Sequence, residues 1–158
     1  MFPILPEAAE APDSATRAGL HLLRFAEDLL GAVELHAQGR YGLSAGRLSL
    51  LLGLARAETQ WLRPAELAEQ LRVTRATVTG LLDALESAGL VARRRDPCDR
   101  RGIRVALTGA GRALVGRIAP GHALRLGAVM RALSDDDRVR LAALLDKVRA
   151  GFDALRGP

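Results

Sequence analysis

The chain has 158 residues, enough for one domain with a modest extension, and 49% of them are apolar, which is ample for a core. It carries 23 Lys and Arg against 18 Asp and Glu, a net charge of +5, so an acidic partner suits it better than a basic one. A single cysteine excludes an intrachain disulfide, and no apolar run is long enough to suggest a membrane span. We therefore expect a cytoplasmic protein that does not enter a membrane.

The N-terminal part is expected to hold an arm and two helices. Residues 1–12 contain three prolines and no basic segment, which is typical of an irregular arm rather than a signal peptide. Asp13 or Ser14 can cap a first helix that frays near Gly39, and Ser44 can cap a second. The apolar stripe of the first helix is wide, which predicts burial on more than one side.

Two short helices joined by a tight turn follow. Pro64 suits the first turn of the third helix, and Arg72 lies in the turn. Thr74 can cap a fourth helix that Gly89 ends, with apolar residues at i, i+3, i+4 and i+7 between them. Such a pair is a helix-turn-helix, whose second helix enters the major groove of DNA. The outer face of that helix is expected to carry Arg75, Ala76, Thr77, Thr79, Gly80 and Asp83.

The residue types on this outer face suit contacts with DNA. Arg75 can make two hydrogen bonds to guanine or contact a phosphate. Thr77 and Thr79 can bond to base edges or phosphates, and their methyl groups can touch thymine. Gly80 fits either a close approach of the helix to DNA or a tolerated surface position. Because short helix pairs are common in helical proteins, the pattern alone is a moderate indication of DNA binding.

A hairpin with six arginines comes next in the chain. Its strands are expected from Val91 and over 103–107, where apolar residues alternate, with a proline-containing turn between them. A hairpin placed after a helix-turn-helix is a wing, and an arginine at its tip can enter the minor groove. We expect Arg101 to do so, with Asp99 holding its guanidinium. The alternative is a solvated run of charge; the remaining arginines, expected to contact phosphates, are Arg93, Arg94, Arg95, Arg100 and Arg104.

Two long helices are expected to complete the chain. Thr108 can cap the first of them, and Pro120 should kink it. Ser134 can cap the second, since three aspartates follow it in the first turn. The leucine-rich helices at the two ends of the chain outsize the central unit that they could cover, which favours dimerisation over a self-contained helical cap.

Five stretches of the sequence resemble the MarR family of bacterial transcriptional regulators. They run from about Leu67 to Gly111, and few other winged-helix families combine this wing with this following helix. Two positions depart from the family pattern: Arg72 stands where glycine is common, and Gly80 where a long polar residue is common. The stretches are Leu67-Ala68-Glu69-Gln70-Leu71, Val73-Thr74-Arg75-Ala76-Thr77-Val78-Thr79, Leu85-Glu86-Ser87-Ala88-Gly89-Leu90-Val91, Asp96-Pro97-Cys98-Asp99-Arg100-Arg101 and Leu107-Thr108-Gly109-Ala110-Gly111.

The resemblance implies a mainly α fold, with a winged helix-turn-helix lobe, a two-stranded β wing and a dimerisation lobe built by both ends of the chain. It implies a triangular homodimer whose interface lies in roughly 14–40 and 119–155. The recognition helix, Thr74–Ala88, would lie in the major groove of a near-palindromic site, with Arg101 in the minor groove. The expected segments are a flexible N-terminal arm (1–12), N-terminal dimerisation and support helices (13–60), the DNA-binding lobe (61–107) and C-terminal dimerisation helices (108–158).

Members of the family often respond to phenolic or other small aromatic anions, and some respond to oxidation or zinc. Two Cys98 residues of one dimer cannot pair, because wings serving half-sites about 34 Å apart keep their Cα atoms well beyond the ~7 Å limit of a disulfide. The three histidines lack ligand spacing, so we expect no metal and no cofactor. The candidates for an anion pocket, with surface or interface roles as the alternative, are His21, Arg24, Tyr41, Arg47 and Trp61.

The resulting hypothesis is a homodimeric repressor that binds double-stranded DNA and is released by a small-molecule effector. The alternative is a winged-helix module that binds proteins and no DNA, which would need a neutral or apolar recognition face. An enzyme is not expected, because the chain lacks a phosphate-binding glycine loop, a metal cluster and a nucleophile with a base. The residues expected to contact DNA are Thr74, Arg75, Thr77, Thr79, Arg94, Arg95, Asp99, Arg100 and Arg101.

Overall fold

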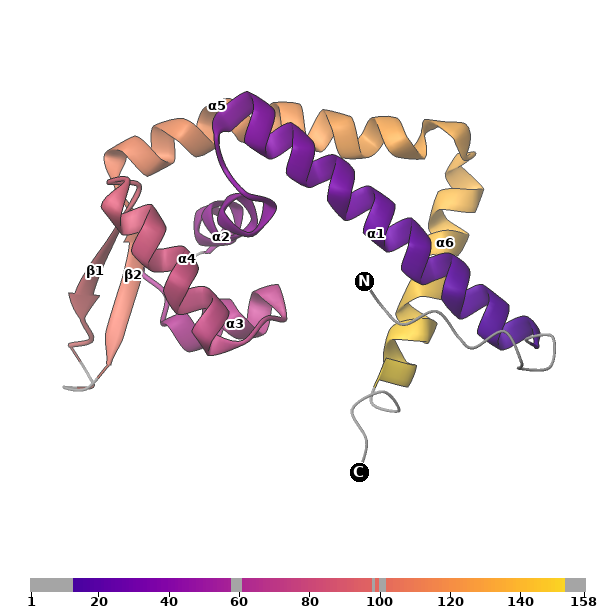
Figure 1. Cartoon of the computed structure of the whole chain (residues 1–158), viewed down its shortest axis with the longest axis horizontal. Helices are drawn as coiled ribbons and strands as arrows, with labels where there is room; N and C mark the ends of the chain where they lie inside the picture. The colour runs from indigo at the N-terminus through magenta and orange to yellow at the C-terminus, as the bar shows by residue number, and fades with distance from the viewer. Residues whose placement is uncertain (1–12, 58–60, 98, 100–101, 153–158) are drawn as a thin grey trace. The chain divides into compact units, whose positions relative to one another are not determined.

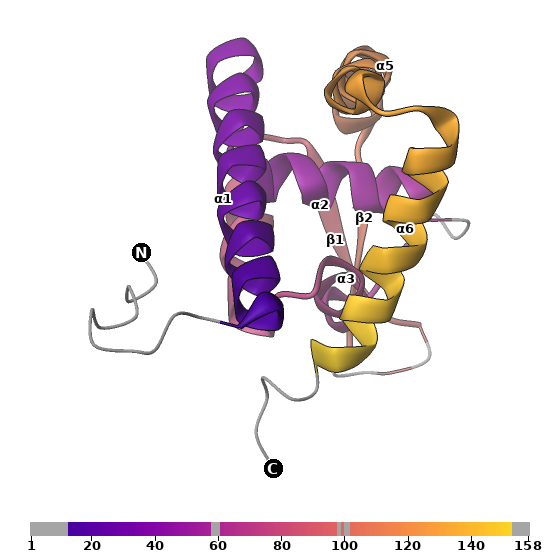
Figure 2. The same ribbon diagram turned by 90° about the vertical axis from the view of Figure 1, so that its right-hand side faces the viewer.

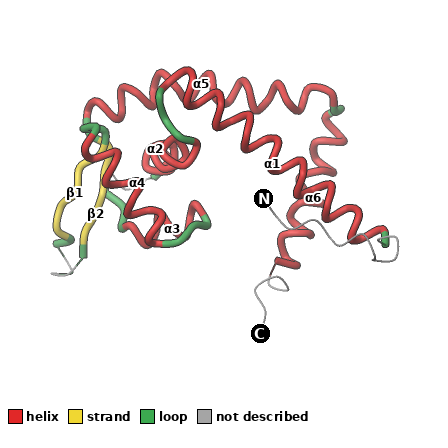
Figure 3. The backbone as a smooth tube through the Cα atoms, viewed as in Figure 1, coloured by secondary structure: helices red, strands yellow, loops and turns green. Residues whose placement is uncertain are grey.

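The computed structural model of the chain describes residues 13–57, 61–97, 99 and 102–152. Within them the fold is mainly helical with one two-stranded antiparallel sheet, as predicted (Figure 3). The described residues form two compact units, the first ending at Gly111 and the second beginning at Arg112. The elements are α1 (Ser14–Tyr41), α2 (Ala45–Arg56), α3 (Pro64–Leu71), α4 (Arg75–Ser87), β1 (Val91–Arg95), β2 (Ile103–Leu107), α5 (Gly109–Val129), a 3-10 turn (Met130–Ala132) and α6 (Asp135–Ala150).

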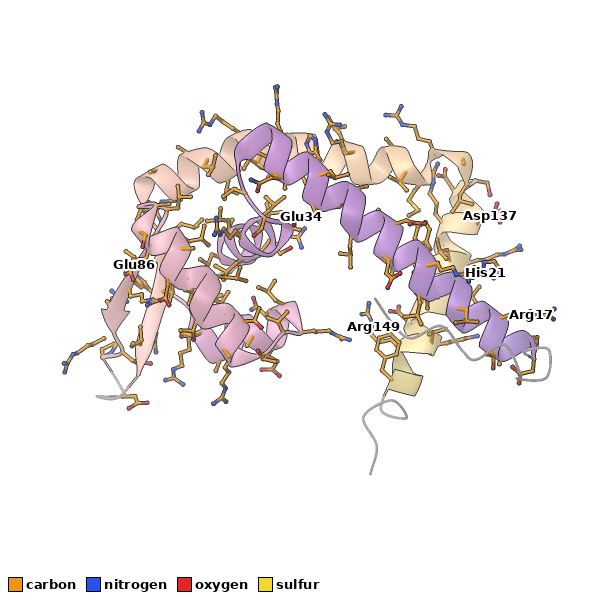
Figure 4. The ribbon with its side chains drawn as sticks, viewed as in Figure 1. Arg17, His21, Glu34, Glu86, Asp137 and Arg149 are labelled. Carbon is orange, nitrogen blue, oxygen red and sulfur yellow. The ribbon has the colours of Figure 1, made fainter. Side chains whose placement is uncertain are left out.

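Helix α1 begins at the predicted cap and ends later than predicted. The amide of Thr16 donates to the Asp13 carboxylate at 2.7 Å, and this bond lowers the pKa of Asp13. The helix passes Gly39 and ends at Gly42, whose positive φ of 65° closes it. Its N-terminal half extends away from α2, α3 and α4 (Figure 1). Near its C-terminal end, Glu34 points toward α2 (Figure 4) and accepts a hydrogen bond from the α2 amide of Ala45 at 2.5 Å.

The helix-turn-helix forms from the local signals that the sequence carries. Pro64 is the first residue of α3, and Arg72 closes that helix in a left-handed conformation. Thr74 caps α4, with its side chain accepting from the amide of Thr77 at 3.1 Å. Gly89, at φ 69°, follows the end of α4. These bounds confirm the predicted cap, turn and stop.

The core of the first unit lies where α2, α3 and α4 meet the hairpin. Figure 2 shows α2 and α3 in front of the two strands, and both helices contact β2. Burial of these aliphatic side chains is the main force that holds the unit together, at about 25 cal/mol per Å² removed from water. The fully buried large side chains of this core are Leu48, Leu50, Leu51, Leu67, Val78, Leu82, Leu85 and Val105.

The hairpin has the predicted strands in a defined register. Val91 pairs with Leu107 at its base and Arg95 with Ile103 near its tip. Leu62, ahead of α3, exchanges two backbone hydrogen bonds with Val105 at 2.9 and 2.7 Å, an isolated β-bridge that the sequence did not predict. Although Ile103 continues the apolar alternation, it is exposed because the tip projects past the core.

The segment after β2 ties the hairpin to the following helix. Thr108 caps α5, since its side chain accepts from the amide of Gly111 at 3.0 Å. The same hydroxyl donates to the carbonyl of Gly89 at 2.7 Å. A Cβ added at Gly111 would overlap the carbonyl oxygen of Leu90. The Leu-Thr-x-x-Gly stretch therefore combines a helix cap with a close approach of two backbones that only glycine permits.

The second unit consists of the rest of α5, the 3-10 turn and α6. Helix α5 continues through Pro120 to Val129. Ser134 caps α6, because its side chain accepts from the amide of Asp137 at 3.2 Å, as predicted. None of the residues of α6 is buried in the isolated chain, although the helix carries an apolar stripe. Over the described residues, no helix combines the length and apolar character needed to cross a bilayer.

Candidate nucleic-acid interface

Helix α4 presents a polar face to solvent and an apolar face to the core. Val78, Leu82 and Leu85 are buried on the inner side, and they hold the helix against α2 and α3. The opposite side carries a cation, hydroxyl groups and small residues, which leave room for a groove of DNA. The exposed residues of this face are Arg75, Ala76, Thr77, Thr79, Gly80 and Asp83.

The three threonine hydroxyls of α4 and its cap are already engaged locally. The hydroxyls of Thr74 and Thr77 lie 2.8 Å apart and bond to each other. Thr79 donates its hydroxyl to the carbonyl of Arg75 at 3.0 Å, within its own helix. Each hydroxyl oxygen keeps acceptor capacity for a further partner. Arg75 differs, because its guanidinium makes no hydrogen bond or ion pair with any described residue.

Arg93 connects the wing to the recognition helix. From β1 its guanidinium reaches the carboxylate of Asp83 at 2.6 Å and that of Glu86 at 3.5 Å, both on α4. Figure 4 shows Glu86 on the side of α4 near the hairpin. Two carboxylates thus balance this cation and link the strand to the helix. The expectation from the sequence, a phosphate contact, did not include this role. Each exposed pair contributes less than about 1 kcal/mol to stability, so the consequence is chiefly geometric.

A buried carboxylate anchors the base of the wing turn. The side chain of Asp96 is fully buried, and its Oδ2 accepts from Arg63 Nε at 2.8 Å. Arg104 Nε lies 3.0 Å from the same oxygen, although its N–H does not point along a hydrogen bond. The bond to Asp96 and the charge of Asp96 raise the pKa of Arg63 above its ordinary value. Since Arg63 precedes α3, this cluster joins the wing to the helix-turn-helix.

The guanidinium of Arg94 lies 3.9 Å from the centroid of the Trp61 ring, a cation–π contact. Arg95 is exposed at the end of β1. Two backbone hydrogen bonds of 2.9 Å close the turn beyond it. The amide of Asp96 donates to the carbonyl of Gly102, and the amide of Gly102 donates to the carbonyl of Asp99. The predicted sites Arg100 and Arg101, together with Cys98, lie outside the described residues.

The five candidates for an anion pocket do not form one pocket within a single chain. Arg24 and Tyr41 both lie on α1, separated by 17 residues and therefore by about 26 Å. His21 and Arg24 line a shallow depression on α1 together with Arg17 and Leu20. Figure 4 shows Arg17 and His21 on the N-terminal half of this helix.

The other candidates have separate surroundings. Tyr41 packs edge-on against His36, with the ring centroids 5.6 Å apart. Arg47 is half-buried in the first turn of α2, and Trp61 lies at the wing against Arg94. Across the part of the chain that the structure describes, no three His, Cys, Asp or Glu side chains gather as metal ligands would.

Sequence reasoning missed the two ion-pair clusters that position the wing. Asp96 belongs to the wing stretch, but nothing in the spacing shows that its carboxylate is buried against an arginine 33 positions earlier. Arg93 was grouped with the other wing arginines because a strand pattern does not reveal which side chain meets a neighbouring helix. The sequence signal that could have helped is the pair Asp83 and Glu86, two acids near the end of the recognition helix and shortly before the arginine-rich strand.

Three comparisons agree with this geometry. The model of the MarR family matches residues 41–102. The HTH-type transcriptional repressor YetL of Bacillus subtilis is 37% identical over 126 residues, covering 80% of this chain and 75% of the relative. Sco3205, a MarR family transcriptional regulator from Streptomyces coelicolor solved in complex with DNA, has a TM-score of 0.82 at 26% identity, covering 90% of this chain and 94% of that one.

A further solved relative concerns control by a small molecule. It belongs to a study of how 6-hydroxynicotinic acid regulates DNA binding of BpsR from Bordetella bronchiseptica. Its TM-score is 0.73 at 28% identity, and the match covers 84% of this chain and 98% of that one. The chain folds as a winged helix-turn-helix with a polar, exposed recognition face, and the family model and these relatives match it. It therefore belongs to the MarR family of transcriptional regulators, which are not enzymes.

Proposed function

We propose that this protein is a repressor that binds a near-palindromic DNA site as a homodimer and is released by a small anionic or phenolic ligand. The observation that carries the DNA-binding part is the exposed face of α4, where Arg75 is unpaired among the described residues beside a wing that Arg93 links to the helix. A protein-binding module would need a neutral or apolar face at this place. We expect the protein to act in the cytoplasm, where bacterial DNA lies.

The homodimer is proposed from apolar surface that the single chain leaves uncovered. Each of the long helices carries several large apolar side chains that remain exposed in the isolated chain, and exposed apolar surface of this kind marks interfaces. A two-fold axis would place two recognition helices about one helical turn of DNA apart, which matches a palindromic site. The exposed apolar residues of the long helices are Leu23, Phe25, Leu30 and Leu35 on α1, Leu124, Leu126 and Val129 on α5, and Val139, Leu144, Leu145 and Val148 on α6.

The effector is proposed to be an anion, with 6-hydroxynicotinic acid, named for the BpsR relative, as a first probe. His21 and Arg24, beside Arg17, form the candidate contacts of the first unit for a carboxylate. Tyr41, Arg47 and Trp61 stay as separate candidates. By thermodynamic reciprocity, an effector that releases DNA must bind the DNA-free protein more tightly than the DNA-bound protein.

The test is selection of bound fragments from the parent genome, followed by mobility shift on the selected fragments. A repressor of this kind retains a few fragments with an inverted repeat, at an affinity at least a thousandfold above that for random DNA. Adding the candidate acids to the same complexes then identifies the effector. If no fragment is enriched over input DNA, the proposed function is wrong and the protein-binding alternative gains support.

A further inference from the structure

Three helices of the first unit are followed by a residue in the left-handed conformation, one position past the helix at α1 and α3 and two positions past it at α4. In each case the amides of this residue and of the next one donate to carbonyls of the last helical turns, which closes the turn. At α1 this residue is Gly42 (φ 65°), and after α4 it is Gly89 (φ 69°). At α3 it is Arg72, with φ 54° and ψ 41°. The bonds there run from Arg72 to Glu69 at 3.1 Å and from Val73 to Ala68 at 3.0 Å.

Arg72 is therefore the exception among three equivalent positions. A residue with a Cβ is strained in the left-handed region, whereas glycine is not. Among the described residues, Arg72 is the only one other than glycine with a positive φ. The chain uses glycine at the two matching positions, so the local geometry by itself favours glycine here. A side chain kept in a strained conformation calls for a function of that side chain.

Within the described residues, the side chain of Arg72 has no role in packing or in internal charge pairing. Its side chain is exposed, so it fills no part of the core. Among the described residues, no hydrogen bond or ion pair involves its guanidinium. Val73 beside it is also exposed, at 39%, so the turn as a whole faces solvent. Packing and internal pairing thus leave the charge of Arg72 unexplained.

The position of the turn indicates what the charge can meet. Arg72 precedes Thr74, the cap of the recognition helix, by two residues, which places their Cα atoms within about 7 Å. In a helix-turn-helix the first helix crosses the DNA backbone while the second lies in the major groove, so the turn between them passes the rim of the groove. We propose that Arg72 binds a backbone phosphate at that rim. This inference rests on the proposed DNA binding.

The test uses three variants of the full-length protein and a genomic fragment that the wild-type protein binds. Arg72→Gly removes both charge and strain, Arg72→Ala removes the charge alone, and Arg72→Lys keeps both. Thermal unfolding without DNA measures the strain. Fluorescence anisotropy from 50 to 300 mM salt measures affinity and its salt slope. The matched control is Arg56→Ala, which removes an exposed arginine from α2, outside the expected DNA contacts and dimer interface.

We expect Arg72→Gly to raise the Tm by about 2–4 °C. Losing one phosphate contact lowers the salt slope by about 0.9 per subunit, which weakens binding by about fivefold per subunit at 0.15 M salt. The loss should be equal on selected and random DNA, because a phosphate contact carries no sequence information. Arg72→Ala should show the same loss without the gain in Tm, and Arg72→Lys should stay close to wild type in both.

Two results would overturn the assignment of Arg72. One is a salt slope that is the same for Arg72→Gly, Arg72→Ala, Arg56→Ala and the wild-type protein. The other is an Arg72→Gly protein no more stable than Arg72→Ala, which would remove the strain on which the inference depends. A wild-type protein that binds no genomic fragment is a separate failure, since it overturns the proposed function together with the contact.

Discussion

Arg63 Nε donates a 2.8 Å hydrogen bond to Oδ2 of Asp96, whose side chain is fully buried. The bond connects the start of α3 to the turn of the wing, so two parts of the DNA-binding surface share one anchor. It is distinct from the second connection, in which Arg93 of β1 pairs with α4. The wing is thereby held to both helices of the helix-turn-helix.

Asp96→Ala should destabilise the protein through loss of this anchor. Breaking a buried ion pair costs about 3–5 kcal/mol, and we expect about 1–3 kcal/mol here because Arg63 is 46% exposed and can be hydrated. Urea unfolding at a fixed protein concentration measures the change. Asp146→Ala, which removes an exposed carboxylate 3.9 Å from Arg149, is the control and should change stability by less than about 0.5 kcal/mol. Equal effects of the two substitutions would contradict the anchor.

Gly111→Ala and Gly109→Ala should have opposite effects although they lie two residues apart on α5. A Cβ at Gly111 meets the carbonyl of Leu90, which cannot move without shifting the hairpin, so we expect a loss of about 1–3 kcal/mol or more. A Cβ at Gly109 meets nothing within 4 Å, and alanine favours the helix, so stability should stay equal or rise by up to about 1 kcal/mol. Chemical denaturation of both variants checks the prediction, which fails if Gly111→Ala is as stable as Gly109→Ala.

Arg101→Ala should weaken binding to sites with AT-rich flanks, since a narrow minor groove concentrates the negative potential that an inserted arginine uses. Arg101 lies outside the described residues, so the prediction depends on the sequence pattern. We expect the salt slope to fall by about one unit, measured by anisotropy against salt. The same site with GC-rich flanks serves as the control and should lose less affinity. An unchanged affinity and slope on both sites would rule out the minor-groove role.

Leu144→Glu should weaken the proposed homodimer. Leu144 is 58% exposed in the isolated chain, and a carboxylate buried at an interface without a partner is strongly unfavourable. Light scattering across a dilution series should show the mass falling from two chains to one, and DNA affinity should fall with it. Asp146→Lys, at an exposed polar position of α6, should keep the wild-type mass. A Leu144→Glu protein that stays dimeric at every concentration would place the interface elsewhere.

Much of the fold could be predicted because its signals are local. Asp13, Thr74, Thr108 and Ser134 each receive a hydrogen bond from the amide three residues later. Thr74, Thr108 and Ser134 were predicted as caps, and Asp13 was one of two candidates, with Ser14, for the first. A cap needs only a short polar side chain and the next helical turn, so its signal lies within a few residues. The end of α1 was placed too early, at Gly39, because glycine alone does not show which position takes the left-handed conformation.

The sequence predicted which face of α4 is exposed, but it did not predict the contacts that the individual wing arginines make inside the protein. The exposed face of α4 follows from helical periodicity, which sorts residues into buried and exposed sides. Periodicity does not show that Arg94 stacks on Trp61 while Arg93 pairs with two acids of α4. Those contacts depend on how the hairpin packs against the helices.

The sequence by itself determined the order of the elements, their caps and turns, and the family, since each depends on short stretches of the chain. Tertiary structure decided which charges are used inside the protein and which remain for a partner. Asp96 and Arg63 are 33 residues apart, and Arg93 and Asp83 are 10 apart, so only the packed core brings them within hydrogen-bond distance. Ion pairs act over a few ångströms, and those distances are set by the fold rather than by sequence spacing.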